Sequence, residues 1–396
     1  MQVMLKECFR WYGPEDPVTL RDTRQCGAAG LFTSLHQIPY GAEWPRAAIH
    51  ERRERIEAAG QRWEVVESLP VSESIRSRVG DFEAHLENYR QSLRHLAAEG
   101  LRVVVYNFMP VLDWVRTDLS YRLEDGSECL RFDPVHFAAF EVFLLKRAGA
   151  DASYSEAQLR AAQAFVESMD MNQSHHFGQR IIDSFPGCKL GFGLDDIRRL
   201  LEDYKGVDAE QLREHYRLFL EAVIPTAEEV GVRLAVHPDD PPFSILGLPR
   251  IVSTEADLRA IVEMVPSPSN GLCFCSGSLG ARRENDLPGI VKRLGKAIHA
   301  VHLRSVQIQP CGSFYEARHL EGSVPMPAVM DALLTENGRR EEPHHLCFRP
   351  DHGHRILDDL NKPANPNPGY DYLGRMRGLA ELRGLQTGLL YRNLSG

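Results

Sequence analysis

The chain has 396 residues, of which 43% are hydrophobic and 26% are charged, a balance typical of a globular protein with a large core. The formal net charge is −9 and the Lys and Arg residues are dispersed, which excludes the basic footprint of a nucleic-acid-binding protein. No segment reaches the roughly 18 uninterrupted apolar residues of a membrane span, and the charged first ten residues do not resemble a secretory signal. We therefore expect a cytoplasmic protein.

Eight cysteines are scattered along the chain without the spacing of a disulfide framework. We expect reduced thiols, most of them buried as ordinary core residues. They are Cys8, Cys26, Cys129, Cys188, Cys273, Cys275, Cys311 and Cys347.

Eight short segments rich in β-branched and apolar residues recur, and most are followed by a stretch with helical periodicity. Such alternation predicts a parallel sheet, and eight repeats allow it to close into a (β/α)8 barrel, an α/β fold. The expected strands are 5–10, 30–35, 63–67, 102–106, 233–236, 272–275, 300–303 and 345–349. The clearest helices between them are 44–59, 82–99 and 209–230.

One connection, from Val111 to Asp208, is too long for a single link between a strand and its helix. It contains helical patterns of its own over 134–146 and 155–168. We therefore predict one TIM-barrel domain over 1–396, with a helical insertion at 111–208 after the fourth strand that covers the mouth of the barrel.

Four potential metal ligands follow the last four predicted strands, at the end of the barrel where active sites of this fold form. They are His237, Cys275, His302 and Asp351. Each has an ordinary structural explanation when taken alone, but all four fall at the same depth on adjacent strands. Imidazole, thiolate and carboxylate together suit Mn²⁺, Fe²⁺, Co²⁺ or Zn²⁺ better than Mg²⁺ or Ca²⁺. The spacing thus indicates a metal site.

Other polar residues near the strand ends have two interpretations each. Arg10, Arg304 and Arg349 are either planar forks for a substrate carboxylate or ordinary salt-bridge partners. Glu67 is either a general base or a buried structural carboxylate. The aspartates that follow Pro238 are either carboxylates behind the metal ligands or, as we prefer, part of a surface turn.

Long motifs spread over nearly the whole chain resemble the mannonate dehydratase family, a branch of the xylose-isomerase-like barrels. The motifs are RWYGPEDPV, TSLHQIPYGAEW, VVESLPV, YNFMPVLDWVRTDL, HPDDPPFSILGLPRIVS, CSGSLG, HLRS, RPDHGH and NPGY. The resemblance implies conversion of D-mannonate to 2-keto-3-deoxy-D-gluconate in hexuronate (glucuronate) catabolism, with Mn²⁺ or Fe²⁺ and no organic cofactor. It places the family's metal ligands on the four residues named above and its acid and base on His352 and Tyr370.

Dehydration of a sugar acid removes the C2 proton and the C3 hydroxyl, so one group must accept a proton and another must donate one, on opposite faces of the substrate. The sequence leaves open which of His352 and Tyr370 is the base. We prefer Tyr370, helped by the metal and by Arg375, with His352 as the acid. We expect His36, Asn107 and Arg304 to orient the substrate.

Two segments depart from the family pattern, so the aldonate range is open. The segment HLEGSVPM, near 319–326, replaces the usual HLNGDVDM and carries Ser323 and Pro325, and the stretch from 170 to 187 also diverges. The alternatives are a metal-dependent sugar isomerase or epimerase, a dehydratase of another aldonate, or a ligand-binding protein that keeps the metal as a structural element. We expect a small sugar acid as ligand, no nucleic acid or membrane partner, and a homodimer, the commonest assembly.

Overall fold

The computed structural model describes residues 3–111, 113–184 and 192–394. Eight parallel strands close into a barrel, in which β1 pairs with both β2 and β12. The strands are β1 (Lys6–Arg10), β2 (Gly30–Thr33), β3 (Arg62–Glu67), β4 (Val103–Tyr106), β7 (Arg233–Val236), β8 (Asn270–Cys275), β9 (Ile298–Leu303) and β12 (Cys347–Pro350). The predicted barrel is confirmed, and every expected strand overlaps an observed one.

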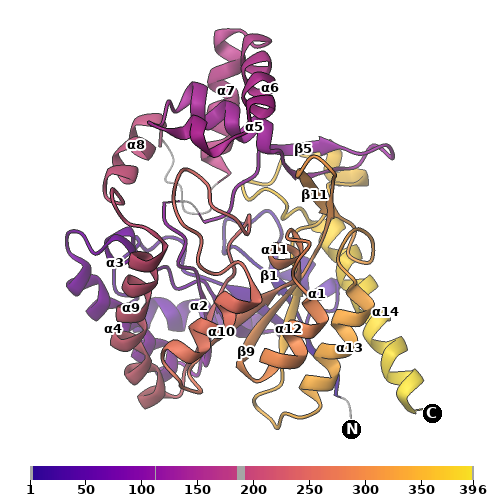
Figure 1. The fold of residues 1–396 in the computed structure, drawn as a ribbon. Coiled ribbons are helices and arrows are strands. Elements are labelled where there is room, and N and C mark those ends of the chain that lie inside the picture. The colour runs from indigo at the N-terminus through magenta and orange to yellow at the C-terminus, as the bar shows by residue number, and fades with distance from the viewer. Residues whose placement is uncertain (1–2, 112, 185–191, 395–396) are drawn as a thin grey trace.

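Helices surround the barrel (Figure 1). They are α1 (Leu20–Gln25), α2 (Arg46–Ala58), α3 (Glu73–Ser77), α4 (Phe82–Ala98), α9 (Ala209–Val230), α10 (Glu255–Met264), α11 (Ser276–Gly280), α12 (Leu287–Leu294), α13 (Met326–Asn337) and α14 (Tyr372–Leu394). The longest predicted helix, α9, has clear end signals: Asp208 and Gln211 form a capping box at its start, and Gly231 ends it with φ 67°.

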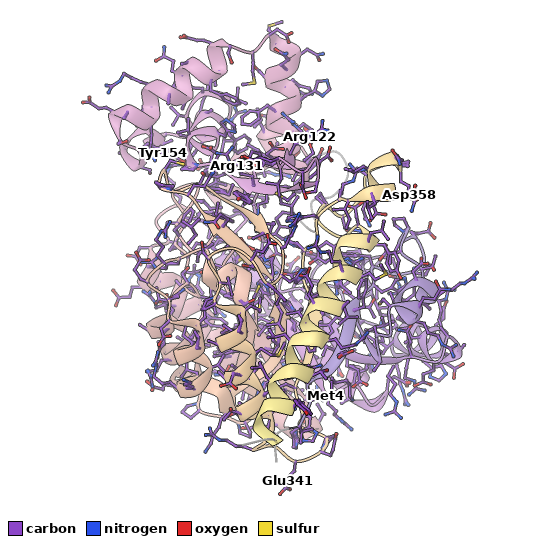
Figure 2. All side chains as sticks on the ribbon, turned by 90° about the vertical axis from the view of Figure 1, so that its right-hand side faces the viewer. Met4, Arg122, Arg131, Tyr154, Glu341 and Asp358 are labelled. Atoms are coloured by element: carbon purple, nitrogen blue, oxygen red, sulfur yellow. The ribbon has the colours of Figure 1, made fainter. Side chains whose placement is uncertain are left out.

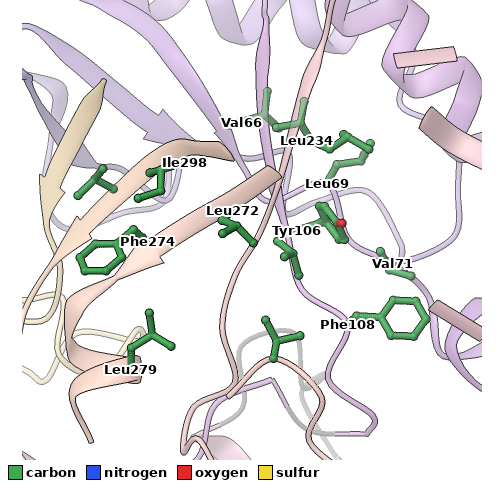
Figure 3. Packing of buried hydrophobic residues seen from close by; sticks show 14 of the residues in the cluster. Val66, Leu69, Val71, Tyr106, Phe108, Leu234, Leu272, Phe274, Leu279 and Ile298 are labelled. Carbon is green, nitrogen blue, oxygen red and sulfur yellow. The ribbon is translucent and has the colours of Figure 1, made fainter. Parts of the chain in front are cut away.

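The alternation of side chains along the barrel strands separates two apolar cores. One set of positions points inward and forms a small cluster that includes Val65, Ala235 and Ala300. The neighbouring positions, such as Val66 and Leu234, belong to the larger cluster that packs against the helices (Figure 3). Because both faces of the sheet are buried, each strand is a continuous run of apolar residues. This is why the positions of the strands could be predicted from the sequence.

The segment between β4 and α9 contains strands as well as the expected helices. Its helices are α5 (Pro134–Ala138), which continues as a π-helical turn (Ala139–Leu144), then α6 (Glu156–Glu167), α7 (Met171–Asp183) and α8 (Leu194–Glu202). It begins with β5 (Asp118–Arg122) and β6 (Glu128–Phe132), which join β10 (Ser305–Ile308) and β11 (Phe314–Ala317) in an antiparallel sheet of order β10-β11-β6-β5. The sequence analysis did not predict this sheet. It ties the insertion to the chain that leaves β9, and the insertion lies over one end of the barrel (Figure 1).

Seven of the eight cysteines are free thiols, as expected, and Cys188 lies outside the described residues. The divergent stretch from 170 to 187 is described only as far as residue 184. None of the helices in the described part of the chain is both long enough and apolar enough for a membrane span.

A buried pair of tyrosines joins β4 to α9 and offers a test of this packing. The hydroxyls of Tyr106 and Tyr216 lie 2.7 Å apart, and neither has another hydrogen-bond partner among the described residues. We predict that Tyr216→Phe lowers the free energy of unfolding by about 1–3 kcal/mol, because it leaves one buried hydroxyl unpaired. The double variant with Tyr106→Phe should recover most of this loss in denaturant melts. If the second substitution lowered the free energy of unfolding by the same amount again, the hydrogen bond between the two hydroxyls would be contradicted.

Candidate metal centre and active site

The four predicted metal ligands come together at the C-terminal end of the barrel. One ligand atom from each of His237, Cys275 and His302 lies within 4.8 Å of the other two. The fourth residue, Asp351, approaches from β12, and its Oδ2 lies 3.8 Å from Sγ of Cys275. The adjacency of β7, β8, β9 and β12 in the barrel produces this meeting. The role of the four residues as ligands stays a prediction.

Both histidines are oriented by a second contact. Nδ1 of His237 lies 2.7 Å from the carbonyl oxygen of Pro238 and is therefore the donor, so Nε2 is the nitrogen left for the cluster. Nε2 of His302 lies 3.0 Å from Oε2 of Glu67. A carboxylate beside a ligating imidazole fixes the ring and raises its basicity. The position of Glu67 thus favours the structural interpretation over that of a general base.

Cys275 is held in an environment that favours the thiolate. Its Sγ accepts from the backbone N–H and the hydroxyl of Ser278, at 3.5 and 3.2 Å. Burial alone would favour the neutral thiol, but Arg304 and the two imidazoles outweigh it and hold the pKa of Cys275 well below its usual range. Gly277 makes this possible, because a Cβ there would lie 2.0 Å from Nε of Arg304.

The donor set fits a divalent cation. Two imidazoles and a thiolate favour transition metals over Ca²⁺ and Mg²⁺, and the carboxylate can bind either kind of ion. The partners that orient them, Glu67, Ser278 and Arg304, are in place around the cluster. The side chains are therefore already arranged for a metal ion.

Arg349 organises the β12 side of the site. Its guanidinium donates to both carboxylate oxygens of Glu67, at 2.9 and 2.6 Å, and to Oδ1 of Asp351 at 2.5 Å. The hydroxyl of Tyr370 donates to the same Oδ1 at 2.9 Å. Since burial raises the pKa of Tyr370 well above its usual value despite nearby Arg349, this hydroxyl keeps its proton.

The contacts of Arg375, His352 and Tyr370 bear on the choice of acid and base. Arg375 does not contact the hydroxyl of Tyr370: it donates to the backbone carbonyl of Tyr370 at 2.7 Å and lies 5.2 Å from its ring centre. The rings of His352 and Tyr370 are in edge-to-face contact at 5.0 Å, so they lie side by side in the cavity wall and do not face each other across it. Which of the two groups is the base stays a prediction.

His352 is fixed on its inner side. Its Nδ1 lies 3.0 Å from Oε1 of Glu316 and 2.8 Å from Nη1 of Arg304, and its ring packs on Trp114 with centroids 5.2 Å apart. Because Nδ1 is occupied by these groups, Nε2 is the nitrogen left for the cavity.

A cavity opens beside these residues, and two of the three predicted substrate contacts line it. His36 and Asn107 are both in its wall, together with Arg10, Asp113 and His352. Oδ1 of Asn107 accepts from Arg76 at 2.9 Å, so its NH2 group is left for a ligand. Enclosure in the cavity and the cations of Arg10 and Arg52 lower the pKa of His36 to about 3, so His36 is neutral.

The third predicted contact, Arg304, lies behind the cavity wall and does not line it. It is 1% exposed, and its guanidinium contacts Asp240 at 2.6 Å, Glu316 at 2.8 Å and Asp351 at 3.4 Å. From this position Arg304 stabilises these buried carboxylates. Asp239 and Asp240 are 0% and 2% exposed, so the preferred interpretation of a surface turn was wrong for both.

The sequence analysis missed several residues of the site. Glu316 comes from β11, and Arg116, which pairs with Glu316 and Asp240 at 2.7 Å each, precedes β5. Trp114 and Asp113 come from the same stretch. All of them reach the site through the unpredicted sheet or the loop before it, and their spacing along the chain carries no signal. The only signal in the sequence that pointed to these residues was the pair Asp113-Trp114 within a long motif.

The cluster can be tested with a spectroscopic metal. We predict that Co²⁺ added to metal-free protein produces a thiolate-to-cobalt absorption band, because Sγ of Cys275 faces the two imidazoles. The band should disappear in Cys275→Ser and remain in Cys273→Ala, which removes a neighbouring buried thiol of the barrel interior. A band that survives in Cys275→Ser would exclude this thiol as a ligand.

The chain is similar to known proteins over almost its whole length. Residues 5–393 match the family model for D-mannonate dehydratase (UxuA). A mannonate dehydratase of Marinomonas sp. (strain MWYL1) is 49% identical over 389 residues, which cover 97% of this chain and 99% of the relative. Another, from Chromohalobacter salexigens, is 48% identical over 388 residues, which cover 97% of this chain and 99% of the relative.

Solved structures give the same picture. The structure of mannonate dehydratase from Streptococcus suis serotype 2 is similar to this one with a TM-score of 0.77 and 32% identity, over 98% of this chain and 94% of that chain. A xylose isomerase domain protein from Planctomyces limnophilus has a TM-score of 0.50 and 11% identity over 98% of each chain, and this likeness concerns the fold alone. The chain belongs to the D-mannonate dehydratase family.

Proposed function

We propose that the protein is a hydro-lyase that converts D-mannonate to 2-keto-3-deoxy-D-gluconate and water, in hexuronate catabolism. The observation that carries the proposal is the meeting of four potential metal ligands, two of which, His237 and Asp351, line one cavity with His352 and Tyr370, in a chain whose family is D-mannonate dehydratase. A second candidate function has no comparable support in the site.

In this proposal His237, Cys275, His302 and Asp351 hold Mn²⁺ or Fe²⁺. When bound, the cation supplies Lewis-acid stabilisation of the negative charge that develops beside the substrate carboxylate. No organic cofactor is required, since the overall reaction is not a net oxidation or reduction.

The cavity residues bind and orient the sugar acid. Arg10 lines the cavity and has no ion pair among the described residues, so its guanidinium suits a substrate carboxylate. One nitrogen of Arg10 already donates to the backbone carbonyl of Glu67, and the other lies 3.2 Å from Nε2 of His36. Neutral His36 and the free amide of Asn107 are then available for the hydroxyl groups of the substrate.

His352 and Tyr370 carry the proton transfers. We assign His352 the tautomer whose Nδ1–H donates to Glu316, 3.0 Å away, and not the one whose Nδ1 accepts from Arg304, 2.8 Å away. In this tautomer Nε2 is a base for the proton on C2. Tyr370, which keeps its proton, is the donor for the departing hydroxyl on C3. Their edge-to-face contact supports transfer at two neighbouring carbons from one side of the substrate. The enol product then tautomerises to the 2-keto acid.

The assignment of the two groups predicts the behaviour of matched variants. His352→Asn and Tyr370→Phe should each lower kcat for 2-keto-3-deoxy acid formation by about 10²–10⁴. The control Tyr372→Phe should keep its activity, because the Tyr372 hydroxyl bonds only to the backbone carbonyl of Asp22 among the described residues. Near-normal turnover by Tyr370→Phe would remove it from the mechanism.

Removal of the metal separates the proposal from its alternatives. A chelator should abolish turnover of D-mannonate, and added Mn²⁺ or Fe²⁺, but not Ca²⁺, should restore it. Proton NMR of the product should show the CH2 group of a 3-deoxy acid. An epimerised or isomerised sugar in its place would favour the isomerase alternative, and metal binding without turnover of any aldonate would favour a non-catalytic role.

A further inference from the structure

A second groove lies at the opposite end of the barrel, where the strands begin. Arg233 is the first residue of β7, Lys296 comes just before β9, and Arg339, Arg340 and His344 follow α13; all of them line this groove. Figure 2 places the neighbouring Glu341 at the end of the molecule opposite Tyr154 of the insertion. The groove is therefore remote from the cavity described above.

The groove carries a surplus of positive charge in an acidic protein. Four of its lining side chains, from Arg233, Lys296, Arg339 and Arg340, are cations, and Glu336 is the single carboxylate among its described lining residues. The whole chain has a net charge of −9. A local concentration of cations against such a background attracts anions.

Glu336 does not neutralise this surplus, because two arginines already share it. Its Oε1 lies 3.1 Å from Nε of Arg340 and its Oε2 lies 3.8 Å from Nη1 of Arg339. Arg340 also donates to the carbonyl oxygen of Gly295 at 2.5 Å. Glu336 is therefore the counter-charge of Arg339 and Arg340. The other cations of the groove, Arg233 and Lys296, are left without one among the described residues.

Arg233 and Lys296 have no side-chain hydrogen bond or ion pair within the described part of the chain, and the ring of His344 has none either. Burial and the nearby Arg340 lower the pKa of Arg233. Burial together with Arg233 and Arg340 also lowers the pKa of His344. Arg233 and Arg340 thus repel each other in the groove, and a bound anion would relieve that repulsion.

We propose that this groove is a binding site for a small phosphorylated metabolite. A phosphate group offers several acceptor oxygens and about two negative charges, which match the guanidinium of Arg233, the ammonium of Lys296 and the ring of His344. The apolar side chains of Val262 and Pro268 also line the groove and provide a surface for the organic part of the ligand.

The groove is connected to the metal-binding end by the barrel itself. Strands β7, β8 and β9 all begin at the groove, and the same three strands deliver His237, Cys275 and His302 at their other ends. An anion bound at the groove would therefore contact the same strands that hold the three clustered ligands.

The test is a calorimetric titration of the metal-loaded protein with inorganic phosphate and with glucose 6-phosphate, at constant ionic strength set with KCl. We expect one saturable site per chain, with tighter binding of the sugar phosphate. The double variant Arg233→Gln/Lys296→Gln should weaken binding at least about tenfold, the loss expected for one or more charge-assisted hydrogen bonds. The control Lys292→Gln removes an exposed lysine of α12 that lies outside the groove lining and should bind like the wild type.

Three results would overturn the proposal. The first is the absence of saturable binding to the wild type. The second is unchanged binding in the double variant, which would place the anion elsewhere. The third is an equal loss of binding in Lys292→Gln, which would indicate non-specific attraction. Melting curves check the fold of each variant. If the double variant does not fold, Lys296→Gln is used alone, because it changes a single exposed side chain. Weaker anion binding in this variant would support the proposal, and unchanged binding would overturn it.

Discussion

The neutralisation of buried charge is the constraint on which this site depends. Withdrawing a carboxylate from water costs several kcal/mol unless a partner and hydrogen bonds compensate for the lost solvation. Here three fully buried arginines compensate for four carboxylates: Arg349 pairs with Glu67 and Asp351, Arg304 contacts Asp240, Glu316 and again Asp351, and Arg116 pairs with Asp240 and Glu316. Except for His237, every side chain proposed to bind metal or move a proton belongs to this network or contacts one of its members.

The same network fixes the charge and the orientation of the side chains at the site. Arg304 favours the thiolate of Cys275, Glu67 orients His302, and Glu316 fixes the inner nitrogen of His352. A site whose groups are already charged and oriented needs little reorganisation when a ligand arrives. The arginines contribute through position and charge, and Arg304 does so from behind the wall of the cavity.

The sequence was sufficient for those parts of the site that depend on local pattern. Buried parallel strands are continuous apolar runs, so their ends could be located, and with them His237, Cys275, His302 and Asp351. Glu316, Arg116 and the buried state of Asp240 depend on the pairing of β6 with β11, which joins segments far apart in the chain. No periodicity within either segment encodes that pairing, and Arg304 could not be separated from a substrate-binding arginine without it.

The ion pair between Arg116 and Glu316 joins residues 200 positions apart, one at the start of the insertion and one on a strand that follows β9. During synthesis the first of these partners leaves the ribosome long before the second, and Asp351, His352 and Tyr370 emerge later still. The proposed active site is therefore complete only when almost the whole chain is available. For the same reason the insertion cannot be trimmed to yield a smaller enzyme, since its removal would leave Glu316 and Asp240 short of a counter-charge inside the protein.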